Sequence, residues 1–183
     1  MMISQVLRFL DTYVRNKDVL EVGSGIGTFC NEAYKTAREV VAIDVENKAS
    51  YVVKAKNLSF RLMDATKMEF RPAVFDTVVF YDTIGFLENE FEQIIQESLR
   101  VLREDGQILI CSTQSYDRMV LEKKVLPYLQ SQELGIKLSM YQTMKVVCIT
   151  KHKKVGINYK ELKEKQALWK SLSLFQQLQY MIQ

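Results

Sequence analysis

Three glycines at alternate positions are the residues of this chain best placed to do chemistry. Gly23, Gly25 and Gly27 follow an apolar, β-forming stretch, Val19–Val22, and precede a segment compatible with a helix. This order predicts a buried strand, a tight turn and a helix N-terminus. Glycine reaches positive φ at low cost and lets a ligand lie against bare backbone. Because a helix N-terminus also presents unpaired N–H groups, the turn favours an anionic or carboxylate-bearing ligand.

The spacing of these glycines separates two kinds of ligand site. The dinucleotide fingerprint, Gly-x-Gly-x-x-Gly, requires a glycine at position 28, where this chain has Thr28. The chain instead reads Gly-x-Gly-x-Gly, with the acidic Glu21 two positions before the first glycine. That combination resembles the first motif of the class I S-adenosylmethionine-dependent methyltransferases. A nicotinamide-dependent oxidoreductase is therefore disfavoured.

Strands and helices alternate around the glycine turn. The residue pattern predicts strands at 18–22, 39–44, 59–64, 75–81 and 107–112, and helices at 2–14, 28–35, 47–56, 90–102 and 116–130. A turn is predicted at 105–106, and two last strands, 136–142 and 144–151, are too close in sequence to form anything but an antiparallel hairpin. We expect an α/β fold: a doubly wound, mostly parallel seven-stranded sheet with a C-terminal antiparallel hairpin and helices on both faces. A hairpin at this end of the sheet also resembles the methyltransferase fold.

Polar residues end successive predicted strands, where open α/β sheets bind ligands. The resemblance gives these positions roles: Asp44 accepts hydrogen bonds from the ribose hydroxyls, Asp64 meets the adenine amino group, and Glu21 with the turn backbone holds the methionine moiety. The structural alternatives are that both aspartates cap turns or helices and that the glutamate accepts hydrogen bonds from nearby backbone. The full set of expected cofactor-binding residues is Glu21, Gly23, Ser24, Gly25, Gly27, Asp44, Val45, Met63, Asp64, Ala65 and Tyr81. Within it, Val45 and Met63 are placed to sandwich the adenine, although Met63 could equally be core.

Methyl transfer from a sulfonium requires alignment and exclusion of water rather than a metal. A general base is needed only if the acceptor starts protonated. Tyr81 and Asp82, after the fourth strand, are the candidate catalytic residues, and packing with loop hydrogen bonding is the alternative. The chain has neither the Asn-Pro-Pro-Tyr or Asp-Pro-Pro-Tyr signature of amino-group methylation on adenine, cytosine or glutamine nor the Pro-Cys pair of cytosine-C5 methylation.

The resemblance therefore predicts a methyltransferase that uses S-adenosylmethionine, releases S-adenosylhomocysteine, and methylates an oxygen, nitrogen or carbon acceptor, with a small molecule favoured. An RNA or protein methyltransferase is the first alternative, because the regions around the site are short and Lys151, Lys153 and Lys154 form a small basic cluster. A non-catalytic S-adenosylmethionine-binding or scaffold subunit is the second.

Composition sets the remaining expectations. A chain of 183 residues fits one domain, predicted at 1–155, followed by a helical extension at 156–183 that packs on the domain or on a partner and could form a homodimer. A net charge of +3 is too small to argue for nucleic acid by itself. Three scattered cysteines indicate a reduced, cytoplasmic setting and no metal site. No apolar run approaches the roughly 20 residues of a membrane-spanning helix.

Overall fold

A seven-stranded sheet forms the centre of the computed structural model, which describes residues 2–152. The predicted helical extension at 156–183, with its possible dimer contact, lies outside the described residues. The strands are β1 (Asp18–Val22), β2 (Glu39–Asp44), β3 (Leu58–Leu62), β4 (Phe75–Tyr81), β5 (Leu102–Ser112), β6 (Gly135–Tyr141) and β7 (Met144–Thr150). Their order is β3-β2-β1-β4-β5-β7-β6, and only the pairs made by β7 are antiparallel. The expected fold class is confirmed.

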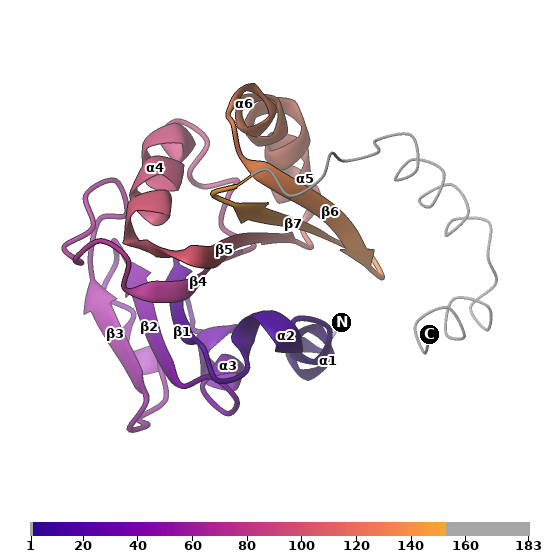
Figure 1. Cartoon of the computed structure of the whole chain (residues 1–183). Coiled ribbons are helices and arrows are strands. Elements are labelled where there is room, and N and C mark those ends of the chain that lie inside the picture. The colour runs from indigo at the N-terminus through magenta and orange to yellow at the C-terminus, as the bar shows by residue number, and fades with distance from the viewer. Residues whose placement is uncertain (1, 153–183) are drawn as a thin grey trace.

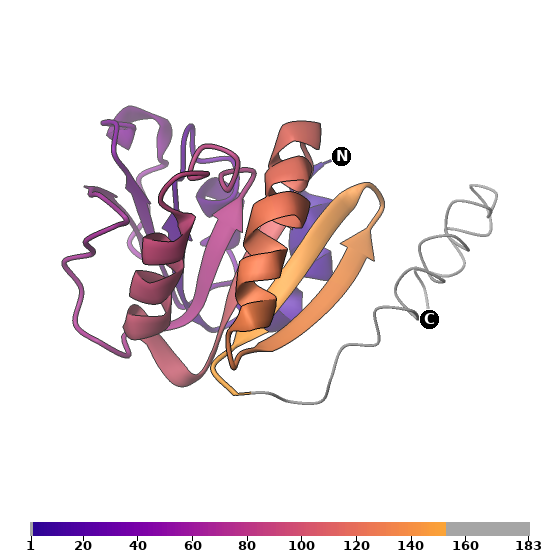
Figure 2. The same ribbon diagram turned by 90° about the horizontal axis from the view of Figure 1, so that it is seen from above.

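Helices cover both faces of this sheet (Figure 1). One face carries α1 (Ile3–Phe9), α2 (Asp11–Val14) and α3 (Cys30–Ala33), and the other carries α4 (Phe91–Val101) and the continuous run α5 (Ser115–Val120), η2 (Leu121–Val125) and α6 (Leu126–Ser131). The view from above in Figure 2 shows α4 and the α5–α6 run side by side over the strands. A short 3₁₀ helix, η1 (Ala49–Tyr51), lies between β2 and β3.

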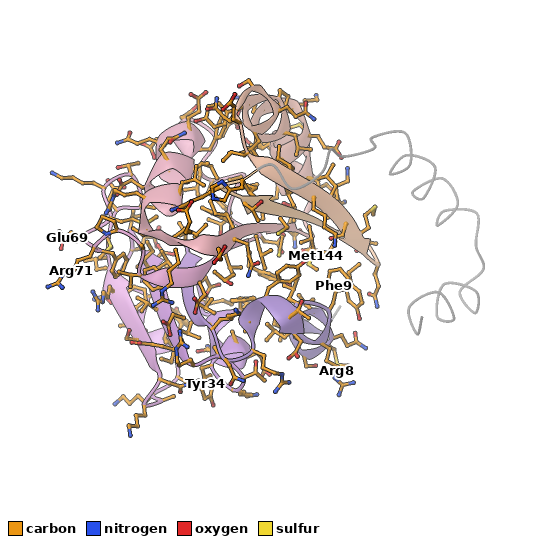
Figure 3. All side chains as sticks on the ribbon, viewed as in Figure 1. Arg8, Phe9, Tyr34, Glu69, Arg71 and Met144 are labelled. Atoms are coloured by element: carbon orange, nitrogen blue, oxygen red, sulfur yellow. The ribbon has the colours of Figure 1, made fainter. Side chains whose placement is uncertain are left out.

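Each face of the sheet has its own apolar core, because the central parallel strands bury side chains on both sides. Ile43, Phe80 and Ile110 belong to the core beneath α4–α6, whereas Val40 and Val79 belong to the core beneath α1–α3. Figure 3 shows side chains filling both layers. At one end of the core beneath α1–α3, the Phe9 ring stacks on the Tyr141 ring with centroids 4.9 Å apart, so α1 packs against the terminal hairpin.

Four predicted elements differ clearly from the structure. The helix predicted at 2–14 breaks into α1 and α2, and the helix predicted at 28–35 shortens to α3. The helix predicted at 47–56 is wrong, because only the 3₁₀ helix η1 forms there and the chain is extended at Val52. The turn predicted at 105–106 is wrong, because β5 begins at Leu102. Phe75 pairs with Leu102 and Thr77 pairs with Gln107, so β5 has residues 103–106 between the two pairs where β4 has only Asp76. Residues 103–106 therefore form a bulge in β5. A Cβ on Gly106 would lie 2.9 Å from the carbonyl oxygen of Asp76, which requires glycine at this bulge.

Parallel strand order brings the carboxyl ends of β1, β2 and β4 to one edge of the sheet, and β1 lies between the other two. The chain reverses its winding direction at β1, where open α/β sheets form a crevice. Among residues 2–152, no helix is long and apolar enough to cross a membrane.

Candidate active site

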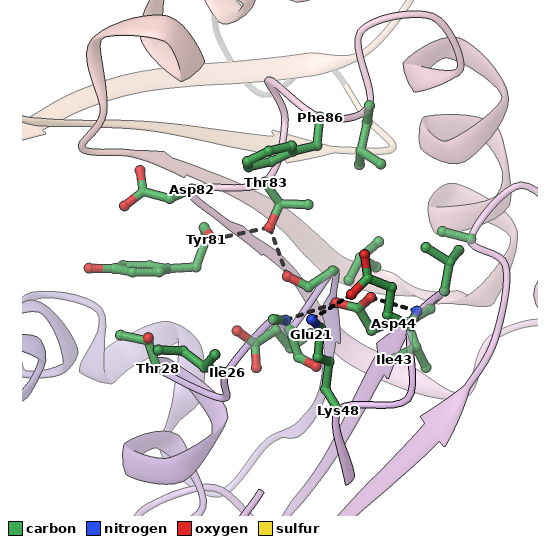
Figure 4. Close-up of a pocket in the computed structure, with 18 of the residues that line it drawn as sticks. Glu21, Ile26, Thr28, Ile43, Asp44, Lys48, Tyr81, Asp82, Thr83 and Phe86 are labelled. Atoms are coloured by element: carbon green, nitrogen blue, oxygen red, sulfur yellow. Dashed lines mark hydrogen bonds and ion pairs between the residues drawn. The ribbon is translucent and has the colours of Figure 1, made fainter. Parts of the chain in front are cut away.

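A cavity of about 740 Å³ opens at the carboxyl ends of β1, β2 and β4 (Figure 4). It brings together most of the residues that the sequence singled out, namely Glu21, Gly23, Ser24, Gly25, Asp44, Val45, Met63, Ala65, Tyr81 and Asp82. Gly27 and Asp64 are not among its lining residues. Segments more than a hundred residues apart in sequence therefore share one wall of a pocket whose size suits a small ligand.

The three glycines of the turn have different surroundings. All have positive φ: +68° at Gly23, +53° at Gly25 and +77° at Gly27. A Cβ on Gly23 would lie 2.3 Å from Cγ2 of Thr83, and one on Gly27 would lie 2.7 Å from Nδ2 of Asn31. A Cβ on Gly25 would meet nothing within 4 Å. Gly23 and Gly27 are thus required by packing, whereas Gly25 leaves bare backbone facing the cavity, where a ligand can approach it.

Ser24 presents a buried hydroxyl to the same cavity. The residue is 5% exposed, and its Oγ has no hydrogen-bond partner among the described residues. A buried polar atom without a partner costs free energy, so such atoms in native structures call for an explanation. A polar ligand in the cavity would supply the missing partner.

Asp44 joins the glycine turn to the segment after β2. Its Oδ2 accepts a hydrogen bond from the Gly25 N–H at 2.9 Å, and its Oδ1 accepts one from the Glu46 N–H at 2.9 Å. The turn-capping alternative is therefore realised through Glu46. An ionised carboxylate offers about four acceptor sites, so each oxygen can still accept a second bond. The side chain is suited to hold two adjacent hydroxyl groups while it fixes the turn.

Glu21 is a buried carboxyl group in the wall of the cavity. It is 2% exposed, and its Oε2 accepts a hydrogen bond from the Cys30 N–H at 3.1 Å. Burial raises the pKa of Glu21 to about 8, and the charge of Asp44 adds to the rise, against hydrogen bonds from Cys30 that lower it. Without a cation beside it, Glu21 is mostly protonated at neutral pH. A ligand ammonium in the cavity would favour its ionised form.

Asp64 is held by its own turn. The exposed carboxylate accepts hydrogen bonds through Oδ1 from the N–H and the hydroxyl of Thr66, both at 2.8 Å. These bonds hold its pKa below the usual range. Its predicted contact with adenine stays a prediction, as does the predicted cofactor contact of Gly27, while the neighbouring Met63 and Ala65 line the cavity.

Tyr81 and Asp82 lie at the opposite end of the cavity from Asp44 (Figure 4). The half-buried Tyr81 ring stacks on Phe29 with centroids 6.0 Å apart. Burial raises the pKa of Tyr81 to about 12, and the charge of Asp82 adds to the rise. The hydroxyl therefore stays protonated at neutral pH, where it can donate or accept a hydrogen bond but is a poor source of phenolate base.

Asp82 connects the ends of β4 and β5. Its backbone is left-handed, with φ +49°. Its Oδ1 accepts hydrogen bonds from the N–H groups of Thr113 at 2.5 Å and Gln114 at 3.2 Å, and the Thr113 hydroxyl donates to Oδ2. The loop hydrogen bonding that was the alternative to catalysis is thus present. The catalytic roles of Tyr81 and Asp82 stay predictions.

Sequence reasoning missed several residues that line the cavity. Thr113 and Gln114 follow β5, and the rule that polar strand ends meet at one edge would have found them. Phe86 lies on the loop after β4, and Thr143 lies at the tip of the terminal hairpin. No local pattern marks either, because their position depends on how distant segments pack.

Comparison with known proteins identifies the fold and its chemistry. The sequence profile of a family described as "Methyltransferase domain" matches residues 20–110. The eEF1A lysine and N-terminal methyltransferase of Bos taurus is 31% identical over 55% of this chain, which spans 16% of that protein.

Two solved structures are similar as well. A SAM-dependent methyltransferase from Aquifex aeolicus superposes with a TM-score of 0.67 at 18% identity, covering 80% of this chain and 88% of that one. The phosphoethanolamine N-methyltransferase 1 of Haemonchus contortus, solved with phosphoethanolamine and S-adenosylhomocysteine, gives a TM-score of 0.50 at 25% identity, covering 61% of this chain and 26% of that one. This chain thus spans about a sixth and a quarter of the two relatives with named substrates.

The matched segment contains the whole of the glycine turn, Asp44, Tyr81 and Asp82. The bare backbone at Gly25, the buried Ser24 hydroxyl and the acceptor capacity of Asp44 fit a nucleoside ligand with polar groups at its other end. The chain carries a class I methyltransferase domain, an enzyme domain whose cofactor is S-adenosylmethionine.

Proposed function

We propose that this domain methylates a small-molecule acceptor, which binds at the end of the cavity lined by Tyr81, Asp82 and Phe86. The observation that carries the proposal is that one cavity contains the glycine turn and, at its other end, polar and aromatic side chains that the turn does not use. When bound, S-adenosylmethionine supplies a methyl group on a positively charged sulfur, which leaves as a neutral thioether.

The residues at the β1–β2 end have the task of holding this cofactor. Asp44 is suited to the ribose hydroxyls, the backbone at Gly25 to close approach, and Ser24 and Glu21 to the polar methionine end. Val45 and Met63 line the cavity beyond β2 and provide apolar surface for the base. Such positioning supplies most of what a methyl transfer requires, because reaction depends on alignment and exclusion of water.

Two features support a small acceptor. The cavity of about 740 Å³ lies within the usual size range for small-molecule sites. The Haemonchus contortus relative is a phosphoethanolamine N-methyltransferase.

The free, buried cysteines Cys30, Cys111 and Cys148 support a cytoplasmic reaction.

A protein acceptor is the second candidate. Phe86 and Ile26 line the cavity and are 91% and 63% exposed, so apolar surface continues outward from its mouth. The Bos taurus relative is named for methylation of a lysine and an N-terminus of eEF1A. An exposed apolar rim of this kind can contact a large partner.

The acceptor class can be tested by following the methyl group. The full chain is incubated with methyl-tritiated S-adenosylmethionine and, separately, with a deproteinised metabolite extract, a protein fraction and an RNA fraction. We expect label in the metabolite extract, and we expect Asp44→Ala to reduce its rate. Label only in protein would support the second candidate, and label only in RNA would contradict both. Cofactor binding without label in any fraction would indicate a non-catalytic binding subunit.

A further inference from the structure

We propose that the acceptor carries a positively charged nitrogen, which is recognised by the Asp82 carboxylate and the aromatic faces of Tyr81 and Phe86. This inference rests on the proposed function and adds the chemical class of the acceptor. It follows from three properties of the acceptor end: no basic residue among the described ones lines it, its one carboxylate has spare acceptor capacity, and an exposed aromatic ring stands there on an anchored turn.

The charged residues divide unevenly along the cavity wall. Of the described lining residues, three acidic ones, Glu21, Asp44 and Glu46, and the one basic residue, Lys48, lie at the β1–β2 end, which leaves Asp82 as the one charged residue lining the acceptor end. Lys48 is already paired with Glu46 at 2.5 Å, and it lies on the same side of the close-up as Asp44, away from Phe86 (Figure 4). An anionic acceptor would therefore meet no free lining cation in the described part of the chain, and its desolvation would be uncompensated.

Arg118, which bonds the backbone of two residues lining the acceptor end, is also occupied. Arg118 donates through Nη1 to the carbonyl oxygens of Thr113 at 2.6 Å and Thr143 at 2.9 Å, and through Nη2 to Ser115. Its guanidinium holds the hairpin tip against the end of β5 and is not among the lining residues. It is thus a structural cation rather than a partner for an acidic substrate.

Asp82 has room for one more donor. Its Oδ1 already accepts from two backbone N–H groups, whereas its Oδ2 accepts only the Thr113 hydroxyl among the bonds found. With about four acceptor sites on a carboxylate, one site on Oδ2 stays available. An ammonium N–H would fill it with a charge-assisted bond, whereas a quaternary nitrogen such as that of choline would gain only the attraction between the two charges.

Phe86 is an exposed residue whose backbone is held in place. The residue is 91% exposed, and its N–H donates to the Thr83 carbonyl at 2.9 Å. The preceding Gly85 N–H donates at 2.7 Å to the carboxylate of Asp117, which is buried and also bonded to Ser112. An aromatic ring on an anchored turn at the rim of this cavity is suited to a cation–π contact.

Methylation of such an acceptor balances without a further reagent. The ammonium first loses a proton, to Asp82 or to water, and its nitrogen lone pair then forms the new bond to carbon. The carbon–sulfur bond breaks, and its electron pair stays on sulfur. The product nitrogen is again positively charged, so the same end of the cavity would retain the product until release.

The test compares three probes of matched shape on the full chain loaded with S-adenosylhomocysteine. Choline is the cation, 3,3-dimethyl-1-butanol is its uncharged isostere, and 3,3-dimethylbutanoate is the anion. Ligand-observed NMR titration gives each Kd. We expect choline to bind at least about threefold more tightly than the alcohol, as a cation–π contact at an exposed site provides, and the anion to bind most weakly.

Two variants separate recognition by the ring from general apolar contact. Phe86→Leu keeps apolar bulk and should bring choline and the alcohol to the same Kd within about twofold. Tyr51→Ala removes an exposed ring that does not line the cavity and should leave the preference intact. The proposal is overturned if the alcohol or the anion matches choline, if none of the three binds, or if Phe86→Leu keeps the preference. Failure of S-adenosylhomocysteine itself to bind would instead refute the proposed function.

Discussion

The two ends of the cavity are built in different ways. At the β1–β2 end, contact surface comes from backbone fixed by positive-φ glycines and from carboxyl groups with assigned partners, such as Asp44 on the Gly25 N–H. At the β4–β5 end, the surface comes from side chains on connecting loops, with Phe86 91% exposed. The first end has little freedom to change without loss of the fold, whereas the second can change while the sheet stays intact.

This contrast matches the division of labour in a methyltransferase domain. A cofactor that stays constant can be bound by backbone, because backbone geometry is set by the strand–turn–helix unit itself. An acceptor that differs between enzymes requires side chains that can be exchanged. Mutations at the two ends should therefore have different consequences. Within the glycine turn, one substitution should mainly lower the stability of the fold and another should mainly weaken cofactor binding.

The largest expected effect is on stability, at Gly23. Gly23→Ala would force a Cβ to within 2.3 Å of Cγ2 of Thr83 at a φ of +68°. Left-handed backbone costs about 1–2 kcal/mol for a non-glycine residue, and overpacking adds about 1–3 kcal/mol. We expect the free energy of unfolding in urea to fall by about 2–5 kcal/mol. The double variant Gly23→Ala/Thr83→Ser should recover part of this loss, and no recovery would show that the clash is not its cause.

At Gly25 we expect a smaller loss of stability than at Gly23, together with a loss of cofactor binding. Gly25→Ala introduces a Cβ that meets no protein atom within 4 Å, so only the backbone cost of about 1–2 kcal/mol applies. The methyl group would project where the ligand approaches, and we expect the Kd for S-adenosylmethionine to rise at least about tenfold. Asn16→Ala is the control, because Asn16 also has a positive φ, +57°, and does not line the cavity. Equal effects of both variants on the Kd would contradict the assignment of Gly25 as the contact surface.

A third expected effect is a pH dependence that comes from Glu21. Its pKa of about 8 in the folded chain exceeds the ordinary value of 4.5. Between these values the folded chain holds a proton that the unfolded chain has released, so stability falls as pH rises through this window. We expect the free energy of unfolding, without ligand, to decrease from pH 5 to pH 8 more steeply in wild type than in Glu21→Gln. Parallel profiles would show that Glu21 does not titrate there.

The sequence was most informative where local pattern decides the structure. The strands β1, β2 and β4 begin and end at the predicted residues, because each is an apolar run that is buried on both faces. The sequence prediction was wrong at 105–106. Asp105-Gly106 has the residue types of a turn, but β5 pairs with β4 on both sides of it, so the strand continues through this dipeptide as a bulge. Here tertiary contacts override local preference.

The candidate site follows the same division. That Glu21 and Asp44 line the cavity could be predicted, because a motif fixes their distance from a strand end. Phe86 and Thr143 could not, because their places depend on the loop anchored by Asp117 and on the tip of the terminal hairpin. Asp64 shows a further limit, since a strand-end carboxylate can also accept hydrogen bonds within its own turn, and its contact with adenine stays a prediction.

The central claim is that the glycine turn and Asp44 bind S-adenosylmethionine. Calorimetric titration of the full chain with S-adenosylmethionine, S-adenosylhomocysteine and NAD, repeated on Asp44→Ala, tests it most directly. We expect the first two to bind and NAD not to bind. Hydrogen bonds to a charged group are worth about 1.5–3 kcal/mol each, so Asp44→Ala should weaken binding at least about tenfold while the circular dichroism spectrum stays folded. Absence of S-adenosylmethionine binding at millimolar concentration, or an unchanged Kd in Asp44→Ala, would contradict the account.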